Sequence, residues 1–168
     1  MGGYRGNKGW RALPGEDDTA SVAAMLAGAR QARSDPVTAE RAVLQALALA
    51  PDDIEALLGA YRFYFYNHRL AEALPQAAGI VVQMARRLNV ATDWRLVRPE
   101  DAAFSGAEEA PSLYLQALLA WGYGKVRLGW IDEGCRAIAK VAELDPRDRF
   151  GAGRLLAVIA AGESTGED

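Results

Sequence analysis

The chain contains one histidine and one cysteine, the side chains most often used as a general base and as a nucleophile. His68 stands in a predicted turn between two helices, where a base or a metal ligand would need partner residues within reach. Cys135 has apolar neighbours, and only Arg136 could lower the pKa of its thiol. We therefore predict an exposed turn residue at His68 and a small buried residue at Cys135, and we do not expect an enzyme.

Motifs that hold cofactors give no stronger signal. Gly122-x-Gly124 lies inside a predicted helix and follows no strand, so close helix packing explains it better than a nucleotide-binding loop. A single cysteine excludes an internal disulfide and a multi-cysteine metal site. We find no Ser-His-Asp order and no phosphate-binding loop. The sequence therefore predicts neither a cofactor nor a metal.

Charge and hydropathy limit the partners. The net charge is −3, whereas a nucleic-acid binder needs a basic stripe that displaces counterions. No apolar stretch approaches the roughly 20 residues that span a bilayer, and the first residues hold no apolar leader segment. We expect a soluble, cytoplasmic protein whose partners include neither nucleic acid nor membrane.

The predicted helices that position these residues include two that end on the same short sequence motif. Apolar residues at helical spacing lead into Pro51-Asp52-Asp53 and, later, into Pro146-Arg147-Asp148. In each case the proline cannot continue the helix, and an aspartate is placed to cap the next one. Half of the chain is apolar, β-branched residues are sparse, and no run alternates as a strand does. These features predict an all-α fold.

The periodicity predicts seven helices separated by such signals. They span residues 17–33, 37–50, 54–66, 70–88, 112–128 and 131–144, with the last running from after Asp148 to about Gly162. In the turn after the third helix, Asn67 is the expected left-handed residue. Residues 1–16 are predicted to be a flexible tail and 163–168 an acidic tail, around a helical domain at 17–162.

Short helix pairs that close on Ala-Leu-x-Leu-x-Pro resemble the tetratricopeptide repeat (TPR), a 34-residue unit. Residues 20–53, 54–87 and 115–148 fit its register, and Pro51 and Pro146 are 95 residues apart, two repeats plus 27 residues. The matching positions are Leu26, Ala27, Ala39, Val43, Ala46, Leu57, Ala60, Tyr64, Ala73, Leu118, Trp121, Gly122, Gly129 and Ile138. The resemblance implies about three stacked antiparallel helix pairs, a C-terminal capping helix, and an insertion near 88–114. It also implies that Trp121 points between helices, and that the residue before Cys135 is a small packing position.

The resemblance further implies a binding surface, because first helices of each TPR pair line a groove. The implied lining residues are Glu55, Leu58, Arg62, Phe65 and Tyr66, then Gln116, Leu119, Tyr123, Val126 and Arg127. Aromatic residues and arginines dominate binding energy at protein interfaces, so Arg62, Phe65, Tyr66, Tyr123 and Arg127 are the predicted partner-binding residues. The alternative is that the insertion or the N-terminal tail covers Phe65 and Tyr66. The lysine and asparagine clamp of chaperone-tail binders is not reproduced, since Leu58 and Arg62 stand there.

The insertion is too long and too apolar for a free linker, because it contains Trp94, Val97 and Phe104. We expect it to fold back over the helices. Its basic cluster is followed by an acidic one: Arg86, Arg87, Arg95 and Arg98, then Glu100, Asp101, Glu108 and Glu109. Internal ion pairing and a site for an anionic partner both fit this pattern.

Two functional hypotheses follow. The first is a non-catalytic interaction module, an adaptor or assembly factor that binds a protein or peptide segment in a helical groove. The second is a permanent accessory subunit of a larger enzyme complex, wrapped around a neighbour by its tail and insertion. A free adaptor purifies as a soluble protein, whereas a subunit co-purifies with its complex and behaves poorly alone. The sequence names neither the partner nor the oligomeric state.

Overall fold

The computed structural model describes residues 22–27 and 35–164. Within these residues the secondary structure is α-helix and short 3-10 turns, with no strand, so the predicted all-α fold is confirmed. Residues 22–27 are helical, as the first predicted helix requires. The remainder of that helix, the predicted tail at 1–16 and the last residues of the acidic tail lie outside the described part of the chain.

The chain divides into two compact units, residues 1–63 and 64–168, with the boundary inside helix α3 (Ile54–Tyr66). In the first unit, α2 (Pro36–Leu49) starts with proline at its first position and with Asp35 as its N-cap. Hydrogen bonds from Thr38 hold the pKa of that carboxyl below its ordinary value. The apolar faces of this unit meet in one core, built from Val22, Leu26, Ala46, Ala50 and Ala56.

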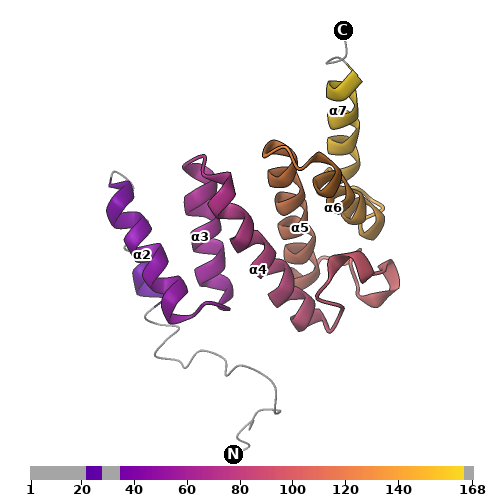
Figure 1. The fold of residues 1–168 in the computed structure, drawn as a ribbon. Coiled ribbons are helices and arrows are strands. Elements are labelled where there is room, and N and C mark those ends of the chain that lie inside the picture. Colours follow the sequence, from indigo (N-terminus) through magenta and orange to yellow (C-terminus); the bar gives the residue numbers. More distant parts are fainter. Residues whose placement is uncertain (1–21, 28–34, 165–168) are drawn as a thin grey trace, which may run out of the picture. The chain divides into compact units, whose positions relative to one another are not determined.

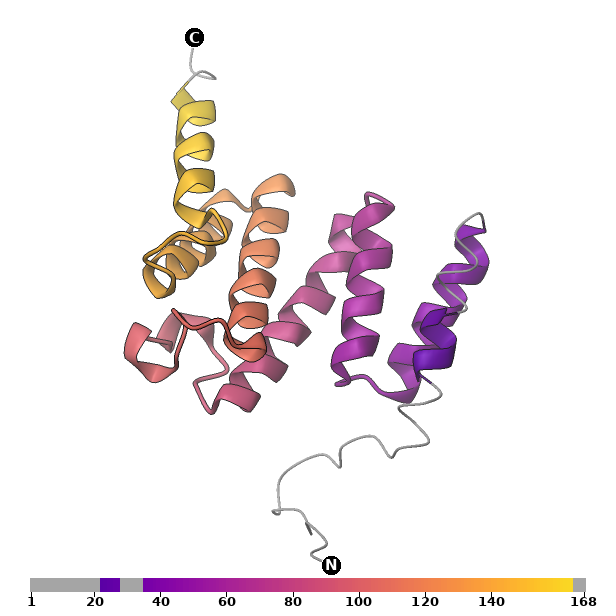
Figure 2. The same cartoon turned by 180° about the vertical axis from the view of Figure 1, so that it is seen from behind.

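In the second unit, the helices are α4 (Leu70–Leu88), α5 (Glu109–Arg127), α6 (Ile131–Leu144) and α7 (Ala152–Ser164). Consecutive helices contact one another: α4 with α5, α5 with α6, and α6 with α7 (Figures 1 and 2). Helices α3, α4 and α6 have the predicted bounds. Helix α5 starts earlier than expected, because Pro111 falls in its first turn, where a proline is tolerated. Helix α7 continues slightly past Gly162.

The repeated Pro-Asp phrase caps helices as predicted. Asp53 accepts a hydrogen bond from the backbone N–H of Ala56, at 2.9 Å, at the start of α3. Asp148 accepts one from the backbone N–H of Gly153, at 2.8 Å, at the start of α7. Each carboxylate satisfies a backbone donor that has no partner inside its helix.

Helices α5 and α6 cross on two glycines. A Cβ atom built on Gly122 would lie 2.9 Å from Ile138 Cγ1 and 3.0 Å from the carbonyl oxygen of Gly134. A Cβ on Gly134 would lie 2.5 Å from the carbonyl oxygen of Gly122. The backbones therefore approach closely only because neither residue has a side chain, which confirms close packing as the reason for Gly122.

The insertion folds back onto the second unit, as its apolar residues predicted. It contains two 3-10 turns, η1 (Trp94–Leu96) and η2 (Pro99–Asp101), and buries Val97 and Phe104. The Lys140 ammonium of α6 donates a hydrogen bond to the backbone carbonyl of Val97 at 2.9 Å. This contact and those of the buried side chains fix the segment against the helices.

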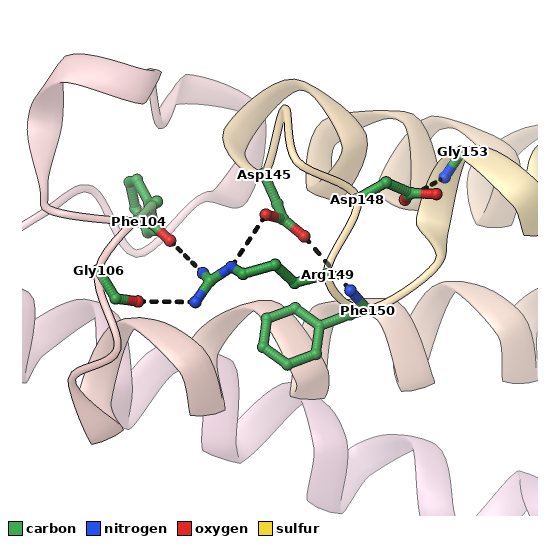
Figure 3. A network of polar contacts seen from close by, with 7 residues as sticks. All are labelled: Phe104, Gly106, Asp145, Asp148, Arg149, Phe150 and Gly153. Atoms are coloured by element: carbon green, nitrogen blue, oxygen red, sulfur yellow. Dashed lines mark hydrogen bonds and ion pairs between the residues drawn. The ribbon is translucent and has the colours of Figure 1, made fainter.

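A polar network joins the insertion to the turn between α6 and α7 (Figure 3). Arg149 forms an ion pair with Asp145, at 3.2 Å between Nε and Oδ1, and Asp145 is only 1% exposed. The same guanidinium donates hydrogen bonds to the backbone carbonyls of Gly106, at 2.7 Å, and Phe104. One arginine thus neutralises a buried carboxylate and satisfies two carbonyls of the insertion.

One positional expectation is wrong. The left-handed residue after α3 is His68, with φ 59°, instead of Asn67. Trp121 is half-buried, and its ring centroid lies 6.0 Å from that of Trp94 in the insertion, so the insertion covers part of this side chain.

Tyr114 carries a buried hydroxyl that has no hydrogen-bond partner among the described residues. Burial also raises the pKa of this phenol, with Asp93 as the second cause. An unsatisfied buried hydroxyl costs free energy in the folded state. We therefore expect Tyr114→Phe to leave the free energy of unfolding unchanged or to raise it by up to about 1 kcal/mol. Urea denaturation measures this, and a clear loss of stability would show that the hydroxyl is in fact bonded.

Candidate protein-binding surface

The outward face of α5 carries four of the five residues that the repeat register placed on a groove. Gln116 and Arg127 are exposed there, and Leu119 and Tyr123 are half-buried. Val126 instead lies against α6, because its Cγ2 is only 2.6 Å from the place that a Cβ on Gly134 would take. The opposite side of α5 is the buried one, with Tyr114, Leu115, Ala117, Leu118 and Gly122. The 3.6-residue period thus separates a packing face from a face of mixed apolar and polar character.

Tyr123 and Arg127 form a pair on this outward face. They are one helical turn apart, so their side chains are neighbours. Arg127 Nη1 donates a hydrogen bond to the Tyr123 hydroxyl at 2.8 Å, and the guanidinium carbon lies 5.7 Å from the centroid of the ring. The arginine is therefore held in one orientation by a hydrogen bond and a cation–π contact.

The last turn of α3, which belongs to the second unit, presents two further aromatic residues. Tyr66 is 75% exposed and Phe65 is 37% exposed, and their rings pack edge to face with centroids 5.7 Å apart. Tyr64 is instead buried, with Arg69 stacked on its ring at 4.9 Å. The exposure of Tyr66 excludes coverage of this residue by the insertion, while coverage by the tail at 1–16 lies outside the described residues.

Arg62 belongs to the first unit and is exposed there, as is Glu55, and Leu58 is half-buried. Phe65 therefore contacts Tyr66, and Tyr123 contacts Arg127, both within the second unit. Arg62 lies in the first unit. The first unit also has a hollow of about 430 Å³ along α2, lined by Val37, Glu40, Arg41, Leu44, Gln45 and Ala48. These side chains form no catalytic grouping.

A second exposed apolar set lies at the turn between α5 and α6, and the sequence analysis missed it. Trp130 is 62% exposed, and Leu128 and Ile131 beside it are exposed as well. The Lys125 ammonium lies 5.1 Å from the Trp130 ring centroid and 5.0 Å from that of Trp121, and it pairs with Glu133 at 3.0 Å. A signal was present: Trp130 directly follows the predicted turn residue Gly129, where no helical core position needs a tryptophan.

Two arginines of the insertion's basic cluster form ion pairs with carboxylates close to them in the sequence. Arg95 bonds Asp93 at 3.2 Å, and Arg98 pairs with Glu100 at 3.5 Å and with Asp101 at 3.7 Å. Internal pairing therefore holds for these two arginines. Arg86 and Arg87 are exposed at the end of α4.

The two candidate catalytic side chains, His68 and Cys135, differ in their surroundings. His68 is exposed in the turn after α3, as predicted. Cys135 is half-buried and not fully buried as expected, and burial is the first cause that raises the pKa of its thiol, followed by the charges of Glu163 and Asp132. A raised pKa disfavours the nucleophilic thiolate. Across residues 22–27 and 35–164, no three His, Cys, Asp or Glu side chains are grouped as metal ligands.

No helix in the described part of the chain has the length and apolar character needed to cross a membrane.

No protein-family model matches the sequence, and no solved structure matches it. One curated protein of Azotobacter chroococcum mcd 1 is 42% identical over 126 residues, which are 73% of this chain and 70% of that protein. The chain belongs to the family of that relative, the uncharacterized 19.8 kDa protein in the nifW 5' region.

Proposed function

We propose that the protein is a non-catalytic adaptor or assembly factor of the cytoplasm that binds a segment of a partner protein. The proposed binding residues are Arg62 in the first unit and, in the second unit, Phe65 and Tyr66 at the end of α3 and Tyr123 and Arg127 on α5. The observation that carries the proposal is the exposure of Arg62, Phe65, Tyr66 and Arg127, with Tyr123 half-buried beside Arg127. Exposed aromatic and arginine residues of this kind are enriched where proteins bind one another.

The resemblance to tetratricopeptide repeats supports a binding role, and one contact agrees with it. Gly122 and the position before Cys135, Gly134, are small positions of the last repeat, and they meet at the crossing of α5 and α6. Stacked helix pairs leave one face of each first helix open to a partner. The acidic net charge favours a protein over a nucleic acid as that partner.

We expect Arg62→Ala and Tyr66→Ala each to weaken partner binding by about 1–2 kcal/mol, while helicity and the melting midpoint stay unchanged. Arg62 and Tyr66 are exposed, so neither contributes to a core. An arginine fork can bond a carboxylate or backbone carbonyls, and a tyrosine offers apolar area at low entropy cost. The full chain is tagged in its own host, its partner is identified by mass spectrometry, and the affinity is measured with both proteins purified.

Leu96→Ala is the control, because Leu96 is a 68% exposed apolar residue of η1 that is not among the proposed binding residues. It should leave binding unchanged. Circular dichroism melts accompany each variant. If Arg62→Ala and Tyr66→Ala lose stability but keep full partner binding, the residues are structural and the proposal fails.

The second candidate is a permanent subunit of a larger enzyme complex. It is favoured by the exposure of Leu128, Trp130 and Ile131, a second apolar set outside the outward face of α5. Obligate interfaces are larger and more apolar than transient ones. Under this hypothesis the chain alone self-associates, and the complex purified from the host contains it in fixed stoichiometry. A monodisperse, stable isolated chain favours the adaptor.

A further inference from the structure

We infer that Arg127 is a preformed receptor for an acidic side chain of the partner segment. This inference rests on the proposed function and names the chemistry of the partner at one point of the surface. The occupant is an aspartate or glutamate side chain, which the guanidinium meets through N–H groups other than the one bonded to Tyr123.

The first argument concerns the hydrogen bonds and ion pairs of the Arg127 guanidinium. A guanidinium has five N–H groups, and a single hydrogen bond to the Tyr123 hydroxyl, at 2.8 Å, accounts for one donor of Arg127. No carboxylate lies within ion-pair distance of it in the described part of the chain, whereas Arg95, Arg98 and Arg149 all have one. An exposed arginine held on one side and open on the other offers a fork that matches a carboxylate.

The second argument is the charge of the surrounding face. After Glu109, helix α5 contains no acidic residue. Its outward side from Gln116 through Leu119 to Tyr123 is neutral, so Arg127 is the charged residue of that face. A partner segment with apolar residues and one acidic side chain complements this face in both hydropathy and charge.

The third argument concerns the order already present before binding. Immobilising a long side chain on binding costs about 0.5–1.5 kcal/mol. The hydrogen bond and the cation–π contact with Tyr123 impose part of that order in the free protein. A cation in the last turn of α5 also interacts favourably with the helix dipole. The dipole does not explain the contacts of Arg127 with Tyr123, however, because it acts on the charge whatever residue lies beside it. Tyr123 is thus a positioning residue for Arg127.

The test compares arginines within one molecule. Nε–H signals of the full-length, ¹⁵N-labelled chain are followed by NMR during titration with N-acetylglutamate α-amide at constant ionic strength. N-acetylglutamine α-amide is the neutral control ligand. Arg86 and Arg87, exposed in the same unit, are internal controls. We expect Arg127 to reach half-saturation at a concentration about three-fold or more below those of Arg86 and Arg87, with no comparable response to the glutamine ligand.

Two variants test the hydrogen bond from Arg127 to the Tyr123 hydroxyl and the role of the guanidinium group. Tyr123→Phe keeps the ring, and with it the cation–π contact, but removes the hydroxyl, so the half-saturation of Arg127 should rise towards that of Arg86 while the melting midpoint stays unchanged. Arg127→Lys keeps the charge and removes the fork; it also assigns the signal. An Arg127 response equal to those of Arg86 and Arg87 in the wild-type chain overturns the inference, and so does a response that Tyr123→Phe leaves intact.

A last arm identifies the source of the carboxylate. N-acetylalanine presents a C-terminal carboxylate, and tighter binding of this ligand than of N-acetylglutamate α-amide would reject the acidic side chain as the occupant. Failure of the inference is distinguishable from failure of the proposed function. In the first case Arg62→Ala and Tyr66→Ala still weaken partner binding, whereas in the second case they do not.

Discussion

Arg149→Met is expected to lower the free energy of unfolding by about 3–5 kcal/mol, because it leaves the Asp145 carboxylate buried without a counter-charge. Asp145 is almost fully buried, and its Oδ1 lies 3.2 Å from Arg149 Nε. The substitution keeps the apolar stem and removes every donor. The carbonyls of Phe104 and Gly106 also lose their hydrogen bonds from the guanidinium. Chemical denaturation followed by circular dichroism measures the change.

Arg154→Met is the matched control. Arg154 also pairs with an aspartate, Asp148, at 3.6 Å, but its side chain is 81% exposed. Exposed ion pairs contribute about 0–1 kcal/mol, so this variant should stay near the wild-type midpoint. Equal losses in the two variants would contradict a special role for the buried pair.

The double variant Asp145→Asn, Arg149→Met separates lost charge balance from lost packing. With the carboxylate neutralised, no buried charge remains uncompensated, and we expect part of the stability to return. This comparison also decides the matter if Arg149→Met alone fails to fold. A double variant that is no more stable than the single one would mean that the hydrogen bonds to the insertion are the larger contribution.

The ends of several helices were predictable because local chemistry decides them. Pro51 stops one helix and Asp53 caps the next within three residues, so no knowledge of the fold is needed to place that boundary. The start of α5 was harder, because a proline in a first turn and a proline before a helix look alike in sequence. The turn after α3 shows the same limit, since Asn67 and His68 are adjacent polar residues and only the backbone decides which one adopts positive φ.

Contacts between distant segments were not predictable. Arg149 and the Phe104 carbonyl are 45 residues apart, and nothing local in either segment marks the partner. Asp145 illustrates the consequence: in sequence it belongs to a helix-ending phrase, but in the structure it is the buried half of an ion pair. The tilted ring contact between Trp94 and Trp121 is of the same kind, because it depends on where the insertion packs against the helices.

For the candidate surface, helical periodicity was enough to separate outward from inward residues. Tyr64 is buried while Phe65 and Tyr66 are exposed, as the register required. Periodicity could not show that Tyr123 holds Arg127, although their four-residue spacing permits it. Trp130 escaped notice because register arguments assign no role to turn residues. Exposure in the folded chain is what identifies it.

Gly134→Ala is expected to lower the free energy of unfolding by about 1–3 kcal/mol or more, through overpacking at the crossing of α5 and α6. The new Cβ would lie 2.5 Å from the Gly122 carbonyl oxygen and 2.9 Å from the Val126 backbone nitrogen. These are backbone atoms, so no side-chain rotation relieves the clash and the two helices must separate. On helix propensity alone alanine would be the better residue by roughly 1 kcal/mol, so a loss of stability has to come from the crossing.

Gly162→Ala supplies the comparison, because a Cβ at Gly162 meets nothing within 4 Å. That variant should be as stable as the wild-type chain or more stable by about 0.5–1 kcal/mol. Both changes add one methyl group to a helical glycine, so the difference between their urea midpoints isolates the helix contact. If Gly134→Ala matched Gly162→Ala, α5 and α6 would not approach through their glycines. Gly122 and Gly134 would then have no packing role at this crossing.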